Sequence, residues 1–167
     1  MSTITQIYGS STTITIAPEN VATSSTFVAG VESSVIDNSS NNFVDALVGG
    51  TWTSGTTPTS GTQVLIYVFS VRDDTPTYPD VMDGTSSAET LTSAGVGAGF
   101  LKLAAVITVD SATSNRPYDV LFSVASLFGG VMPLKWGIFI THNTGVNSNS
   151  TAGNHVWKYT GIKYSVA

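Results

Sequence analysis

The chain contains no cysteine among its 167 residues. It therefore has no disulfide, no thiolate metal ligand and no cysteine nucleophile, and it is indifferent to the redox state of its compartment. Its stability must come from a hydrophobic core or from contacts with neighbouring chains. A core is within reach of this length, since a chain of about 150 residues buries roughly 70% of the surface that it exposes when unfolded.

Charged residues are also scarce, at 10% of the sequence against roughly 25% in a typical soluble domain. There are 6 Lys and Arg against 11 Asp and Glu, which gives a net charge of −5. Because no basic patch is present to neutralise phosphates, the composition argues against binding to nucleic acid or to anionic membranes. The sequence also lacks a secretory signal and any apolar run of about 18 residues, so we expect no signal peptide and no transmembrane helix.

Small hydroxyl side chains are abundant instead, with 22 Ser and 24 Thr. Thr and Val disfavour helices and suit a pleated sheet, and short apolar stretches alternate with turn-rich segments throughout. The pattern predicts an all-β fold, an antiparallel β-sandwich of the eight-stranded jelly-roll type, with a closed up-and-down barrel as the alternative. The predicted strands are residues 12–17, 26–36, 43–48, 63–71, 100–109, 118–127, 134–142 and 155–166.

The first twenty residues form a separate unit in this interpretation. Residues 1–20 are an N-terminal arm or the first strand, and residues 21–167 are the β-sandwich domain. An extended arm of this kind can also reach onto a neighbouring subunit by adding a strand to its sheet. The sequence leaves these alternatives open.

A long connection over residues 72–98 interrupts the strands, and Ser86 could open a helical turn there as an N-cap. Four carboxylates in this connection could hold a hard cation such as Ca²⁺ weakly, because Ca²⁺ takes six to eight oxygen ligands. The alternative is a solvated loop, in which Asp residues serve the turns. The four residues are Asp73, Asp74, Asp80 and Asp83.

Catalytic patterns are not evident. No Gly-x-Ser-x-Gly motif occurs. Few acidic residues are candidates for apolar strands, where burial would raise a carboxyl pKa: these are Glu32 and Asp45, and placement at a strand edge or bulge explains them equally well. His142 and His155 flank one polar loop and could bind a metal with Asn143 or Asn154, although capping or packing under the loop fits them better. We expect neither an enzyme nor a cofactor.

The aromatic residues divide into two groups. Trp136 shares one strand face with Ile138 and Ile140, and Trp157 shares one with Tyr159, which predicts core positions for both tryptophans. Trp52 stands beside two glycines and a Ser/Thr-rich loop, where it could be exposed and stack on a sugar ring. Candidate contacts to a glycan or a protein partner are therefore Trp52, Asn143 and Asn154.

Two stretches of the second half carry a family resemblance. TYPDVMDGTSSAET spans residues 77–90, and SLFGGVMPLKWGIFITHNTGVNSNSTAGNH spans residues 126–155. With these motifs the chain resembles a group of small uncharacterised virion proteins of tailed bacteriophages, over roughly residues 42–167. The resemblance implies a virion component, assembled in the cytoplasm of the bacterial host, and it implies no enzymatic activity.

Composition and resemblance together predict a structural protein of the bacteriophage virion, namely a capsid decoration or cement protein or another virion-surface protein. We expect it to act through contacts with other virion proteins and with itself, as a homo-oligomer and, by analogy, a trimer. Low charge lets many copies pack without self-repulsion. The alternative is a receptor- or glycan-binding jelly-roll module of a tail or head fibre.

Overall fold

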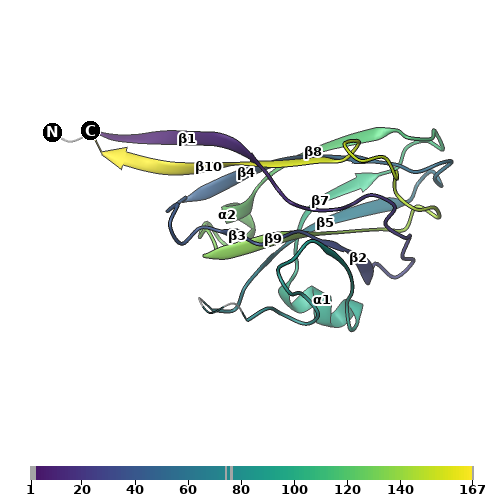
Figure 1. Ribbon diagram of the computed structural model, residues 1–167, viewed down its shortest axis with the longest axis horizontal. Coiled ribbons are helices and arrows are strands. Elements are labelled where there is room, and N and C mark those ends of the chain that lie inside the picture. The colour runs from purple at the N-terminus through teal and green to yellow at the C-terminus, as the bar shows by residue number, and fades with distance from the viewer. Residues whose placement is uncertain (1–2, 74, 76, 167) are drawn as a thin grey trace.

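The computed structural model describes residues 3–73, 75 and 77–166. Figure 1 shows two β-sheets packed face to face, with one long connection folded over the outer side of the lower sheet. The β-sandwich predicted from the sequence is confirmed. The described strands form two separate sheets and not the closed barrel that was the alternative prediction. All strand pairs in the described residues are antiparallel.

The two sheets are built from strands that are distant in the chain. The four-stranded sheet has the order β1 (Ile4–Thr13), β10 (Val156–Val166), β4 (Asp45–Thr53) and β8 (Pro117–Ser123). The six-stranded sheet has the order β6 (Ser87–Thr90), β2 (Ala29–Glu32), β9 (Lys135–His142), β5 (Gln63–Ser70) and β7 (Lys102–Thr108), and β3 (Ile36–Asp37) also pairs with β9.

Several boundaries differ from those predicted. The described residues form ten strands, not eight, because the short strands β3 and β6 were not foreseen. The first strand is Ile4–Thr13, since pairing with β10 fixes it, and residue 16 makes only an isolated bridge to Ser33. The strand predicted for residues 118–127 ends at Ser123, whose side chain caps α2 (Val124–Leu127). The jelly-roll assignment stays a prediction.

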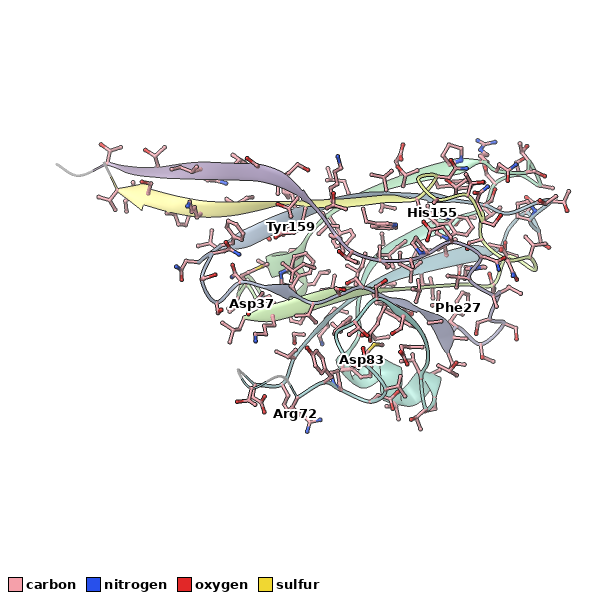
Figure 2. All side chains as sticks on the ribbon, viewed as in Figure 1. Phe27, Asp37, Arg72, Asp83, His155 and Tyr159 are labelled. Atoms are coloured by element: carbon pink, nitrogen blue, oxygen red, sulfur yellow. The ribbon has the colours of Figure 1, made fainter. Side chains whose placement is uncertain are left out.

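Three tryptophans fill the space between the sheets. Trp52, Trp136 and Trp157 are at most 2% exposed, and Tyr159 meets Trp136 edge-on at 5.7 Å between ring centroids. Tyr159 lies between the two sheets (Figure 2). The core positions predicted for Trp136 and Trp157 are confirmed, because the two-residue period places their faces toward the opposite sheet.

A second, smaller core lies on the outer face of the six-stranded sheet. Phe69 and Phe139 point away from the first core and are covered by Met82, Leu91 and Leu101 of the long connection. This connection contains β6 and α1 (Ala94–Phe100), which begins after the N-cap Ser93. The helical turn predicted to open at Ser86 is wrong, because residues 87–90 pair with the edge of β2.

Gly50 is required by the packing of Trp157. A Cβ atom at Gly50 would overlap the indole ring of Trp157 directly across the strand pair. A Cβ at Gly49, on the opposite face, would meet only Leu121 Cδ1 at 3.8 Å, an ordinary contact. A side chain is therefore tolerated at Gly49 but not at the adjacent Gly50.

We predict that Gly50→Ala lowers the free energy of unfolding by about 1 to 3 kcal/mol, because the Trp157 ring must shift within a packed core. The matched control Gly49→Ala should leave stability unchanged or slightly raised, since alanine loses less backbone entropy than glycine on folding. Urea unfolding followed by tryptophan fluorescence measures both. Equal stabilities for the two variants would contradict this account of the core.

Candidate functional site: an asparagine-lined cleft

A polar cleft of about 550 Å³ opens among the loops at one end of the sandwich. It lies where β10 begins, whereas the chain termini lie at the far end of β10 (Figure 1). None of the described side chains that line it is charged. Its lining residues are Asn20, Gly55, Thr56, Asn115, Val146, Asn147, Ser148, Asn149, Ser150, Thr151 and Asn154.

Asn149 forms the floor of the cleft and is only 6% exposed. Its Nδ2 donates to Asn115 Oδ1 at 2.7 Å, and its Oδ1 accepts from Asn154 Nδ2 at 3.1 Å and from the backbone N–H of Thr151 at 2.8 Å. These bonds join the loop before β10 to the loop before β8. The floor is thus fixed before any ligand arrives.

The rim of the cleft keeps unused hydrogen-bonding groups. Asn147 Nδ2 donates to Asn20 Oδ1 at 3.0 Å, which leaves Asn147 Oδ1 and Asn20 Nδ2 free of partners within the described residues. Asn115 Nδ2 and Asn154 Oδ1 likewise have no hydrogen-bond partner within the described residues. The cleft therefore offers both donors and acceptors without charge, which suits a neutral, hydroxyl-rich ligand and not acid–base chemistry.

Trp52 lies beneath this cleft and is fully buried, so the exposed position expected for it is wrong. Its ring lies 5.4 Å from the ring of His142 and 6.3 Å from that of His155, between centroids. The alternation of β4 explains the burial, because Ala46, Val48 and Trp52 share the inward face. The glycines between them hide this alternation in the sequence.

His155 connects the core to the floor of the cleft (Figure 2). Its Nδ1 accepts from the backbone N–H of Thr53 at 3.2 Å, so its Nε2 carries the proton and donates to the carbonyl of Asn149 at 3.1 Å. Burial lowers the pKa of His155 below its usual value, which keeps the ring neutral. Both ring nitrogens are thus committed to backbone groups.

His142 also packs against Trp52 and has a similar environment. Its Nε2 donates to the carbonyl of Val21 at 3.1 Å, and its Nδ1 lies 3.0 Å from Thr144 Oγ1. Burial again lowers the pKa. No group of three His, Cys, Asp or Glu side chains placed to hold a metal occurs in the part of the chain that the structure describes. The hydrogen bonds of both histidines to backbone groups fit the packing role that was expected for them.

Of the three predicted contact residues, only Asn154 lines the cleft. Asn143 Oδ1 instead accepts from the backbone N–H of Gln63 at 2.7 Å, which fixes the start of β5. The sequence interpretation missed the other asparagines of the cleft. The spacing Asn-Ser-Asn at residues 147–149 was a visible signal, whereas Asn20 and Asn115 come from distant loops and only folding brings them there.

The structure does not bring the acidic residues of the long connection together as a cation site. Asp80 accepts from the hydroxyl and backbone N–H of Thr92, Asp83 accepts from those of Thr85, and Asp73 is exposed. Asp74 lies outside the described residues. The alternative of carboxylates that serve the turns therefore describes Asp80 and Asp83 better.

Glu32, the last residue of β2, is a buried carboxyl group that faces a turn of this connection. It is 0% exposed, and its Oε1 accepts from the backbone N–H groups of Asp83 at 3.2 Å and Gly84 at 2.7 Å. Its Oε2 has no partner among the described residues. Burial raises the pKa of Glu32 to about 7, against the lowering effect of the two backbone hydrogen bonds. The raised pKa expected for Glu32 is confirmed.

The position of Glu32 excludes a catalytic carboxylate pair with Asp83. Hydrogen bonds from Thr85 lower the pKa of the exposed Asp83, so the two carboxyl groups titrate in different ranges, as in an acid–base pair. Glu32, however, is inaccessible to any substrate. It serves to hold the turn at residues 83–84 against β2. Asp45 has a comparable role, because its Oδ1 accepts from the backbone N–H of Ala125 in α2 at 2.9 Å.

Comparisons with known proteins leave the family open. No family model matches the chain, and no curated protein matches it significantly. A solved structure described as "Structure of infectious bursal disease virus Gx strain" aligns with 99% of this chain and 28% of its own, at 10% identity and a TM-score of 0.24. The chain thus spans less than a third of that protein. Within the described residues, no helix has the length and apolar character needed to cross a membrane.

We predict that Glu32→Gln changes how stability depends on pH. The folded chain keeps the Glu32 proton up to about pH 7, whereas the unfolded chain loses it near pH 4.5. The wild-type carboxyl therefore destabilises the fold progressively as pH rises through this window. Gln accepts the same backbone hydrogen bonds without titrating, so the free energy of unfolding of the variant, relative to wild type, should rise by about 2 kcal/mol from pH 5 to pH 8.

Chemical denaturation at several pH values measures this difference. Other titrating groups cancel in the comparison because both chains share them. A difference between Glu32→Gln and wild type that stays constant from acid to alkaline pH would contradict the burial of an ionisable group at Glu32.

Proposed function

We propose that this chain is a structural protein of a bacteriophage virion, a capsid decoration or cement protein that acts by contacts with other virion proteins. The observation that carries this proposal is an exposed apolar surface on the outer face of the four-stranded sheet. Surfaces of this kind on otherwise polar proteins mark sites of protein–protein contact.

The strand register identifies this outer face. Trp157 lies opposite Gly50, and both face the core, so the neighbours of Trp157 in β10 face outward. Directly opposed residues in antiparallel strands share a face. By this rule, six exposed apolar side chains lie on the outer side of the four-stranded sheet, which we call the outer apolar face. They are Ile4, Tyr8, Leu121, Val156, Tyr164 and Val166.

The outer apolar face is also poor in charge. Among its exposed positions on β8 and β10, only Asp119 and Lys158 are charged. This face presents these two charges, of opposite sign, to a neighbouring protein, so no cluster of like charge on β8 and β10 opposes contact there. It therefore supports close approach to a neighbouring protein.

The two stretches that carry the resemblance to bacteriophage virion proteins meet in the fold. Met82 lies in the first stretch and Leu91 directly follows it, and both cover Phe139 of the second stretch. The backbone of Gly84, also in the first stretch, is bound by Glu32 of β2, beside β9. The shared motifs thus describe β9 and the connection that covers it. They support a resemblance in architecture, from which the virion assignment follows as an inference.

The proposal predicts that the chain is present in many copies in purified particles of the phage that encodes it. Quantitative mass spectrometry of the particles against the major capsid protein measures the copy number. Purified chain should also bind particles that lack it, and Leu121→Lys should weaken this binding at least tenfold, whereas Val131→Lys, an equally exposed apolar position elsewhere, should not. Absence from the particles would refute the proposal.

A second candidate function is glycan recognition, and the asparagine-lined cleft is the observation that favours it. Its free amide groups and lack of charge match the hydroxyl groups of a neutral saccharide. Its weakness is the buried Trp52, since no aromatic ring lines the cleft for stacking. In this alternative the chain displays the cleft to the host surface.

Glycan-array binding tests this alternative. A neutral oligosaccharide should bind, and Asn154→Ala or Asn20→Ala should weaken binding about tenfold, because each removes groups worth about 1 kcal/mol in a hydrogen bond. Asn41→Ala, an exposed asparagine outside the cleft, is the matched control. Binding that survives both cleft substitutions, or no binding on the array, would contradict glycan recognition in the cleft.

A further inference from the structure

The ends of β1 and β10 form a two-stranded ribbon that projects beyond the sandwich (Figure 1). Strand β4 stops pairing with β10 at the pair Asp45 and Ile162. Beyond that point residues 4–7 pair only with residues 163–166. This projecting ribbon carries the exposed Ile4, Tyr164 and Val166 of the outer apolar face, and its single charge is Lys163.

Three of the four sheet edges carry features that discourage pairing with another chain. β8 begins with Pro117 and includes the charged Asp119. β6 has only four residues and includes Glu89. β7 begins with Lys102 and packs against β8 and α2. Proline, charge, short length and cover are the devices by which proteins protect their edges.

The edge at β1 has none of these devices over its first half. Residues 4–8, Ile-Thr-Gln-Ile-Tyr, are uncharged, contain no proline and pair with β10 in an unbroken register. The register shifts only after Tyr8. All ten residues of β1 are exposed. A row of backbone donors and acceptors on the far side of residues 4–8 is therefore open to another strand.

We propose that residues 4–8 pair in antiparallel fashion with the same residues of a second copy of this chain, about a twofold axis at Gln6. The two four-stranded sheets then form one continuous eight-stranded sheet. This inference deepens the proposed structural function, because it names the surface through which copies assemble.

Charge and symmetry identify the second copy as the partner. An antiparallel strand pair is self-complementary, so each copy supplies the donors and acceptors that the other lacks. Two chains of net charge −5 repel each other, and the uncharged β1 edge lets them meet without opposing carboxylates. Among the described strands β1 has the longest edge without proline, charge or cover, because the edge of β10 that β4 leaves free is only residues 163–166 and carries Lys163. A second copy can therefore offer no better partner than its own β1.

The side chains fit this pairing as well. With Gln6 opposite Gln6 of the second copy, Ile4 of each copy lies opposite Tyr8 of the other, on the face that also carries Tyr164 and Val166. Pairs of aromatic and β-branched side chains stabilise antiparallel strands. Thr5 and Ile7, on the other face, oppose each other in the same way.

Cysteine trapping tests the register, since the chain has no cysteine of its own. Opposed residues in an antiparallel pair have Cα atoms about 4.5 to 5.5 Å apart, within the range of a disulfide. Gln6→Cys should therefore form a disulfide-linked dimer in high yield on mild oxidation. Leu121→Cys, exposed on the opposite edge of the same sheet, is the control and should not. Equal trapping at both positions, or trapping at Leu121 alone, would overturn the pairing.

Solution mass gives the second test. Wild type should be a dimer by sedimentation velocity, and Gln6→Lys, which places two like charges across the axis, should raise the dimer dissociation constant at least tenfold. Ser11→Lys lies on the same strand beyond the register shift and should leave the dimer intact. Circular dichroism checks that all three chains fold. A wild-type monomer across a dilution series, or the trimer expected by analogy, would refute the inference.

The two proposals fail separately. The pairing is measured on the purified chain alone, whereas the virion function is measured by its copy number in particles. A chain that is abundant in particles but monomeric in solution refutes only the pairing, and a dimer that is absent from particles refutes only the virion function.

Discussion

The burial of β9 on both of its faces is the constraint on which the rest of the structure depends. Its inward side chains Trp136, Ile138 and Ile140 form the core between the sheets, and its outward Phe139 anchors the second core. Because Phe139 needs cover, the long connection over residues 71–101 must fold back on the sheet. The last residue of β9, His142, then packs beside Trp52 and supports the loops that form the cleft. The single strand β9 therefore contacts both hydrophobic cores and also supports the loops of the cleft.

Scarcity of charge has different consequences at the two ends. At the end where β10 begins, neutral amides bond to one another only in part and line a polar cleft without a titrating group. At the other end, the absence of charge from residues 4–8 leaves a backbone edge unprotected. The same scarcity makes the exception at Glu32 informative, because its carboxyl group is buried and accepts two hydrogen bonds from a backbone turn, while burial raises its pKa.

Much of the fold follows from local patterns in the sequence, and much of the site does not. The alternation of Trp136, Ile138 and Ile140 is visible in the five residues 136–140 and correctly predicts a core face. Trp52 was misplaced because Gly49 and Gly50 interrupt the alternation, and the reason for Gly50 is Trp157, about a hundred residues away in the chain. Ser86 signalled a helix through local capping chemistry, yet the free edge of β2 drew residues 87–90 into a strand. Tertiary pairing overrides a local preference of this size.

The sequence by itself determined the all-β class, the tryptophan core at positions 136 and 157, and the lack of any thiol chemistry. These properties depend on composition and on the two-residue period, both of which are local. Only the tertiary structure decided that Asn20, Asn115 and Asn149 meet in one cleft, and that β1 lies at an edge with half its length beyond β4. Such facts arise from contacts between segments far apart in the chain, which no local pattern encodes. The physical reason is that the register and order of the strands depend on which faces become buried against other strands and against the opposite sheet. The partners in that burial lie elsewhere in the chain, so the sequence of a single strand does not specify them.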